Sequence, residues 1–264
     1  LKVIAGTFVL TVSLILCMIF VPKKNALDTL QKREAKAKET GKMTEEQLAK
    51  QKANGSESED TICTADLTDD EILEGLNLLL IGDSIAVDVT DDFYEIFPNS
   101  VSDTKIGRIT SLGKQVLDSY IDEKKWEGEG VIFASLSNSP INGELEDIRE
   151  KIGKDMPLFL TTVRIPHDTF EEESNSKIKK FVEENDHTYL IDWYAASKGH
   201  DEYFDADDTH LLSAGAKAYA KCIKEAVLDA YKKENIEIPK SRLVSSTDTS
   251  TDSSNDSSKN ASTE

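Results

Sequence analysis

Cysteine and positive charge are both scarce in this sequence. Three cysteines in 264 residues are too few for a disulfide-rich scaffold, in which bridges replace a hydrophobic core. Lysine and arginine total 31 against 50 aspartates and glutamates, a formal net charge of −19. A chain this acidic has no basic stripe to displace counterions, which excludes a nucleic-acid backbone as its main partner. The 38% of hydrophobic residues is low for a compact domain and indicates that unlike regions are being averaged.

Long hydrophobic runs are also rare, and the clear one lies at the start of the chain. Residues 3–21 contain no charged side chain and are bounded by Lys2 on one side and Lys23 on the other. At about 1.5 Å per residue this run nearly crosses a ~30 Å hydrocarbon layer, which predicts a transmembrane helix rather than a buried soluble one. The first residue is Leu1 and no small-residue cleavage pattern follows the run, which favours an excerpt from a longer membrane protein over a cleaved signal peptide. The basic residues after the run would by themselves place the following chain in the cytoplasm.

Two polar segments flank a single predicted domain. Residues 22–60 carry nearly balanced charges and predict a partly helical, solvated linker, broken near Gly41 and again at 54–56. Residues 241–264, rich in Ser, Thr and Asp, predict a disordered tail because they cannot bury enough apolar surface. Residues 61–240 are enough for one well-buried core, and they carry the net negative charge of the chain.

Within the predicted domain, short apolar runs alternate with segments of helical period. This alternation predicts an α/β sandwich around a mostly parallel sheet, and ligands of such folds bind beyond the carboxyl ends of the strands. The predicted strands are 76–81, 130–134, 157–163 and 188–192, and the predicted helices cover 84–97 and about 108–122, 143–153, 172–185 and 213–231.

A serine directly follows the first of these strands. Gly82 permits a sharp turn, and Ser84 then stands at the N-terminus of a helix, where backbone amides and the helix dipole can stabilise an oxyanion. The plain alternative is an ordinary helix start in which Asp83 or Ser84 is the N-cap residue. The tripeptide alone does not decide between them.

A serine nucleophile needs a base, and the chain has four histidines. One of them, His210, follows Asp207 by three residues on a loop that runs into the last predicted helix. A carboxylate at this spacing can hold one ring nitrogen and turn the other towards a nucleophile. A histidine in an acidic loop is more often a solvated surface residue, but its pairing with Ser84 favours a catalytic role.

Together these two motifs resemble the outer sequence blocks of the SGNH (GDSL-type) hydrolases. That family is named for a nucleophilic Ser, an oxyanion-hole Gly and Asn, and a His base. The resemblance implies that Ser84 is the nucleophile, His210 the base and Asp207 the residue that orients it. It also implies the fold of the family, a three-layer αβα sandwich with a flavodoxin-like sheet.

The two inner blocks of the family have counterparts in the expected order. Residues 105–108 (KIGR) follow a second strand, and the resemblance implies that the backbone amide of Gly107 joins that of Ser84 in an oxyanion hole. Residues 135–140 (SLSNSP) occupy the place of the third block, with Asn138 as the side-chain donor. Leu136 and Ser139 depart from the family, which often has glycine at both positions.

More narrowly, the chain is similar to the extracellular C-terminal domain of peptidoglycan O-acetyltransferases. The supporting residues are 162–166 (TVRIP), Asn175 downstream, and 191–194 (IDWY) before the histidine motif. In that family a multi-helix membrane half precedes a linker and an SGNH domain. The resemblance implies that this chain begins at the last membrane helix and that its domain lies outside the cell.

The resemblance also implies an activity. Ser84 would take an acetyl group supplied by the membrane half and pass it to a muramoyl hydroxyl of peptidoglycan, which blocks muramidases such as lysozyme. Arg164 is a candidate for binding the glycan. No metal or cofactor is implied, since the other histidines and the cysteines have no ligand spacing.

Three matters stay open at this point. An extracellular carbohydrate acetyl esterase would use the same residues and pass the acetyl group to water. A catalytically idle wall-binding or sensory domain is favoured if Leu136 and Ser139 misplace Asn138. Cys63 and Cys222 could bridge the two ends of the domain or remain reduced and packed.

Overall fold

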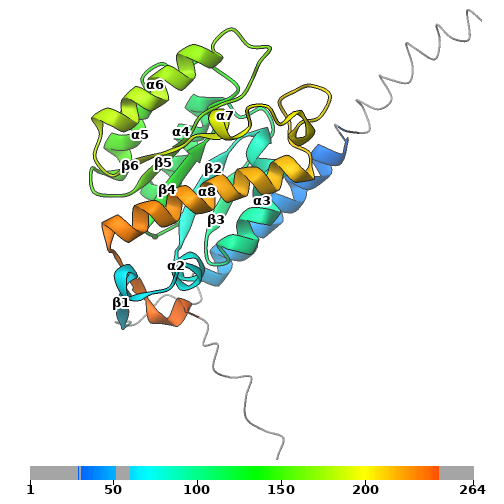
Figure 1. The fold of residues 1–264 in the computed structure, drawn as a ribbon. Coiled ribbons are helices and arrows are strands. Elements are labelled where there is room, and N and C mark those ends of the chain that lie inside the picture. Colours follow the sequence, from blue (N-terminus) through cyan, green and yellow to red (C-terminus); the bar gives the residue numbers. More distant parts are fainter. Residues whose placement is uncertain (1–28, 30, 52–59, 244–264) are drawn as a thin grey trace, which may run out of the picture.

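The computed structural model describes residues 29, 31–51 and 60–243 (Figure 1). The predicted transmembrane helix at 3–21 lies outside these residues, as does most of the predicted tail. Within the described ranges no helix combines the length and the hydropathy that crossing a membrane requires.

A sheet of five parallel strands forms the centre of the molecule, in the spatial order β3-β2-β4-β5-β6 (Figure 1). Along the chain, β2 is the first strand of this sheet. β3 lies on one side of it, and β4, β5 and β6 follow in sequence on the other side, which is the flavodoxin-like order. The predicted mostly parallel sheet is therefore confirmed. The strands are β2 (Leu78–Gly82), β3 (Val101–Thr104), β4 (Gly130–Ala134), β5 (Leu158–Thr161) and β6 (Thr188–Ile191).

Helices cover both faces of this sheet, so the predicted three layers are present. Successive residues of β2 point to opposite faces: Leu78 and Leu80 pack under α3 and α8, whereas Leu79 and Ile81 pack under α4, α5 and α6. All four are fully buried, which explains why β2 is a continuous apolar run. The five helices are α3 (Ser84–Ile96), α4 (Thr110–Asp122), α5 (Glu144–Ile152), α6 (Glu171–Glu184) and α8 (Ser213–Glu234).

A small two-stranded sheet joins the two ends of the domain. In it β1 (Thr61–Cys63) pairs antiparallel with β7 (Glu237–Pro239). The short helices α2 (Asp69–Gly75) and α7 (Trp193–Ala196) complete the fold. Cys63 and Cys222, the two cysteines among the described residues, are both free thiols.

The linker prediction needs a correction, because residues 31–51 form one helix that passes through Gly41 without a break. It lies beside α3 in Figure 1. One face of it is buried on the domain: Thr40 is 1% exposed, and the hydroxyl of Thr44 donates to the backbone oxygen of Ser102 on β3. The helix thereby covers the edge of the sheet that β3 would otherwise leave open.

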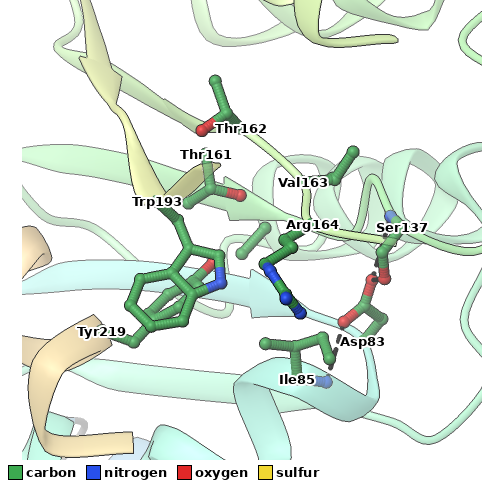
Figure 2. Close-up of a pocket in the computed structure, with 10 residues that line it drawn as sticks. Asp83, Ile85, Ser137, Thr161, Thr162, Val163, Arg164, Trp193 and Tyr219 are labelled. Atoms are coloured by element: carbon green, nitrogen blue, oxygen red, sulfur yellow. Dashed lines mark hydrogen bonds between the residues drawn. The ribbon is translucent and has the colours of Figure 1, made fainter. Parts of the chain in front are cut away.

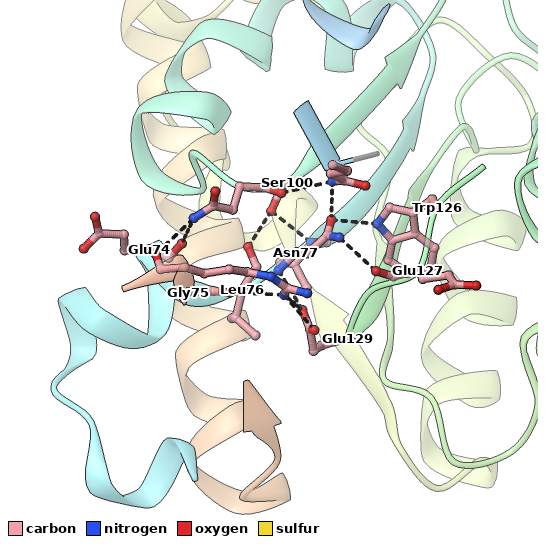
Figure 3. Close-up of polar contacts among 12 residues, drawn as sticks. Glu74, Gly75, Leu76, Asn77, Ser100, Trp126, Glu127 and Glu129 are labelled. Atoms are coloured by element: carbon pink, nitrogen blue, oxygen red, sulfur yellow. Dashed lines mark hydrogen bonds and ion pairs between the residues drawn. The ribbon is translucent and has the colours of Figure 1, made fainter. Parts of the chain in front are cut away.

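A polar network at the amino end of the sheet fixes segments that are far apart in sequence (Figure 3). Asn77 Oδ1 accepts hydrogen bonds of 2.8 Å from Trp126 Nε1 and from Gln51 at the end of the 31–51 helix. The buried carboxylate of Glu129 accepts from the N–H of Asn77 at 2.7 Å and pairs with Arg242 at 2.7 Å. Arg242, which the sequence assigned to the disordered tail, is therefore part of the ordered domain.

Candidate active site

Ser84 is the first residue of α3 and directly follows the carboxyl end of β2. A Cβ at Gly82 would meet the Cβ of Ala86 at 2.1 Å, so this turn requires glycine. Asp83 is the N-cap residue, and its Oδ1 accepts from the N–H of Ile85 at 3.0 Å. The capping interpretation is thus correct for Asp83, and it leaves the Ser84 hydroxyl for another contact.

That contact is with the predicted histidine. Ser84 Oγ lies 2.9 Å from His210 Nε2, and His210 Nδ1 lies 2.7 Å from Asp207 Oδ2. Asp207 Oδ1 accepts from the N–H groups of Thr209 and His210, at 3.1 and 2.9 Å. Partial burial acts to raise the pKa of Asp207, but the hydrogen bonds from His210 and Thr209 hold it below its usual value. The structure therefore brings the three residues together in the order a Ser–His–Asp triad requires.

A residue that the sequence analysis missed ties the two halves of this triad together. Asp88, one turn after Ser84 on α3, accepts from the N–H of Leu211 at 3.1 Å. Burial raises the pKa of Asp88. Residues four apart share a helix face, so the sequence could place Asp88 on the same face of α3 as Ser84. The sequence could not show that Asp88 binds the N–H of Leu211.

Gly107 lies in the turn between β3 and α4 with a φ of +68°, the left-handed region that favours glycine. The next residue, Arg108, is buried and donates to the backbone oxygens of Gly82 (3.0 Å) and Asp103 (2.6 Å). The turn that carries Gly107 is thereby held against the turn that carries Ser84.

Leu136 and Ser139, which replace the glycines common in the family around Asn138, both help to pack the loop. Leu136 is fully buried in the core, and Ser139 Oγ accepts from the N–H of Thr110 at 3.1 Å. Neither Leu136 nor Ser139 has a positive φ, so their side chains cause no backbone strain. Asn138 itself is exposed, with its Nδ2 3.4 Å from Ser137 Oγ, at the long end of the hydrogen-bond range.

Ser137 is a second residue that sequence reasoning missed. Its N–H and its hydroxyl both donate to Oδ2 of Asp83, as Figure 2 shows. Burial raises the pKa of Asp83, while the hydrogen bonds from Ser137 and Ile85 act in the opposite direction. Residues 135–140 are thus attached to the turn between β2 and α3, as residues 105–108 are through Arg108.

Arg164 lies over a small hollow beside these groups (Figure 2), whose lining includes Asp83, Ser137, Thr161, Trp193 and Tyr219. The hollow, of about 10 Å³, has room for roughly one water molecule. The guanidinium of Arg164 sits 3.8 Å above the ring of Phe204 and donates to the backbone oxygen of Asp208. The side chain therefore contacts the loop that carries His210, and its role towards a glycan stays a prediction.

This chain resembles the SGNH hydrolases. They share a parallel sandwich of this strand order, with the four residues of the family name on segments that follow its strands, here Ser84, Gly107, Asn138 and His210. The particular likeness is to peptidoglycan O-acetyltransferases. The chain is 34% identical over 146 residues to O-acetyltransferase OatA of Staphylococcus aureus, a match that covers 55% of this chain and 24% of that protein. It thus spans about a quarter of this relative's length.

Solved structures show the same fold. The C-terminal catalytic domain of peptidoglycan O-acetyltransferase A (OatA) from Streptococcus pneumoniae superposes with a TM-score of 0.55 at 21% identity, covering 62% of this chain and 98% of that domain. A family 3 carbohydrate esterase from Clostridium thermocellum gives 0.50 at 11% identity, covering 61% and 99%. No protein-family model matches the chain.

Proposed function

We propose that this chain is the catalytic part of a cell-wall O-acetyltransferase that works through an acetyl-Ser84 intermediate. The observation that carries the proposal is the continuous Ser84–His210–Asp207 contact, with distances of 2.9 and 2.7 Å, at the end of β2. The 34% identity to an O-acetyltransferase over 146 residues supports acetyl transfer as the reaction.

In the first half-reaction, His210 Nε2 takes the hydroxyl proton of Ser84 while Ser84 Oγ attacks the acetyl carbonyl of the donor. The negative oxygen of the tetrahedral intermediate accepts hydrogen bonds from the N–H groups of Ser84 and Gly107 and from Asn138 Nδ2. The intermediate then expels the donor's oxygen, to which His210 returns the proton. Acetyl-Ser84 remains.

In the second half-reaction, a sugar hydroxyl replaces the donor. His210 removes the proton of the hydroxyl, whose oxygen attacks acetyl-Ser84. The second intermediate then breaks its bond to Ser84 Oγ, to which His210 returns the proton, and the sugar ester is released. We place a muramoyl hydroxyl of peptidoglycan in this role, so that the product blocks muramidase digestion. An esterase differs only in that water attacks instead.

In this proposal the apolar run at 3–21 is a transmembrane tether for the domain. Seven residues, 22–28, separate the apolar run at 3–21 from Thr29, which is already helical. Seven residues can span at most about 25 Å. A transmembrane helix at 3–21, with the domain outside the cell, would therefore keep the end of the 31–51 helix that contacts Asp205 and Asp207 close to the bilayer and to a membrane-bound acetyl donor.

Acetyl transfer and hydrolysis are separated by supplying an acceptor. The full chain, purified in detergent, is given 4-nitrophenyl acetate with and without chitooligosaccharide or peptidoglycan fragments. We expect acetylated sugar, and total ester turnover that rises with acceptor concentration, because a bound hydroxyl attacks the acyl-enzyme faster than water. Release of acetate alone, at a rate indifferent to acceptor, would replace this proposal with an esterase.

Asn138→Ala is expected to lower kcat by about 10²–10³-fold with little change in KM, because the lost amide acts on the oxyanion rather than on the bound ester. Steady-state kinetics with the acetyl ester measure both constants. Asn142→Ala, on the same stretch of chain and also exposed, is the matched control and should keep wild-type kinetics. An unchanged kcat in Asn138→Ala would remove Asn138 from the oxyanion hole and favour the idle-domain alternative.

A further inference from the structure

The buried face of the 31–51 helix ends beside the triad. Arg33 Nη2 donates to Asp205 Oδ2 at 3.0 Å, and Nη1 lies 3.9 Å from Asp207 Oδ2. This is the same Asp207 oxygen that contacts His210 Nδ1. The Arg33 side chain is 16% exposed, whereas those of Asp205 and Asp207 are 29% and 45% exposed, so the guanidinium is the mostly buried member of both contacts.

The next turn of the same helix contacts the element that carries the nucleophile. Lys36 Nζ donates to the backbone oxygen of Asp88 at 3.1 Å and pairs with Asp91 at 3.1 Å, both on α3. Asp88 in turn holds the N–H of Leu211, next to His210. One helix therefore contacts both α3, which begins at Ser84, and the loop before His210.

The helix is also attached to the domain beyond Arg33 and Lys36. In its middle, the hydroxyl of Thr44 donates to β3. At its far end, Gln51 Nε2 donates to Asn77 Oδ1 (2.8 Å) and to the backbone oxygen of Asn99 (3.2 Å), in the network of Figure 3. At about 1.5 Å per residue, 33–51 covers about 27 Å, enough to reach from the amino end of the sheet to the triad.

We propose that Arg33 is a positioning residue for the triad, which makes the 31–51 helix a working part of the active site. Arg33 acts through Asp207. Its guanidinium holds Asp207 in the orientation that faces His210 Nδ1, and it offsets the repulsion between Asp205 and Asp207, two carboxylates of one exposed loop. The inference rests on the proposed function for the roles of Ser84, His210 and Asp207.

The first test is Arg33→Met in the full chain, with two readouts of the triad. One is the second-order rate at which phenylmethanesulfonyl fluoride modifies Ser84, measured by mass spectrometry, and the other is kcat and KM for the acetyl ester. We expect the modification rate and kcat to fall by about 10–100-fold with KM nearly unchanged, because a shift of about 1 Å in a catalytic group has effects of this size. Arg33→Lys keeps the charge without the planar fork and should recover part of both.

The matched control is Lys38→Met, which removes the same charge from the exposed face of the same helix and should change neither readout. Thermal unfolding of each variant is followed beside the kinetics. Equal losses in Lys38→Met and Arg33→Met, or an Arg33→Met loss that follows only a lowered unfolding temperature and is not recovered by Arg33→Lys, would overturn the proposal.

A double-mutant cycle then asks whether Arg33 acts through Asp207. In an Asp207→Asn background, Arg33→Met should cost less than about threefold, because the oriented carboxylate is already gone. The same 10–100-fold loss in both backgrounds would overturn the assigned route. If no sugar is ever acetylated but Ser84 modification still depends on Arg33 in this way, the acceptor is wrong and the positioning role is supported.

Discussion

Ser84→Ala is expected to lower acetyl transfer by about 10⁶-fold and to abolish the acetyl-enzyme adduct, because no other oxygen stands 2.9 Å from His210 Nε2 in the described hydrogen-bond network. The fold should persist. The side chain is small and 6% exposed, and the cap of α3 and the link to the third block use the carboxylate of Asp83 instead. The adduct is measured by mass spectrometry after rapid quenching with the acetyl ester.

Ser119→Ala is the matched control for this variant. Ser119 is a half-buried helical serine on α4 whose hydroxyl donates to the backbone oxygen of Val116 at 2.9 Å. It lies outside the triad, so its removal should leave the adduct and the turnover intact. Acetylation at another residue in Ser84→Ala, with turnover retained, would show that a different nucleophile carries the reaction.

The core of the fold could be predicted because its signals are local. The three inner strands β2, β4 and β5 are buried on both faces, so they appear in the sequence as apolar runs such as 130–134. The edge strand β3, with the sequence VSDT, has no such run, and its range was not predicted from the sequence. Each long helix has an apolar stripe towards the sheet, as in 213–231. The small β1–β7 sheet was missed because its three-residue strands pair across more than 170 positions and have no such run.

The triad could be predicted for a different reason. Ser84 and His210 are 126 positions apart, but the carboxyl ends of parallel strands gather at one edge of a sheet, so motifs that follow strands come together. The residues that fix their geometry could not be predicted. Ser137 and Asp88 act through hydrogen bonds to Asp83 and Leu211, and no spacing rule connects those pairs.

The 31–51 helix was misjudged because most of its specific contacts with the domain are polar. Met43 and Leu48 pack against the core clusters, but the side chains that hydrogen-bond to the domain, which recur every three or four positions, are Arg, Lys, Thr and Gln. A search for an apolar stripe reads such a helix as solvated. Its partners include backbone oxygens on α3, on β3 and just before β3, and carboxylates beside the triad, none of which is visible as a sequence pattern.

His210→Gln is expected to lower kcat by about 10⁶-fold while the KM for the acetyl ester stays nearly constant. Glutamine is polar and of comparable length, and its amide can still contact Asp207, but it cannot accept the proton of Ser84. The residual rate should therefore rise with hydroxide concentration, because hydroxide replaces the missing base. Steady-state kinetics over a range of alkaline pH measure both effects.

The double variant Ser84→Ala/His210→Gln should be no slower than either single variant, because the two residues act as one unit and removing either already removes the covalent route. His200→Gln is the matched control: that histidine pairs with Glu202 at 2.8 Å and stacks on Tyr203, away from Ser84, and its loss should leave kcat unchanged. Costs that multiply in the double variant would mean that Ser84 and His210 serve separate steps. A triad that transfers acetyl groups through Ser84 requires that they do not multiply.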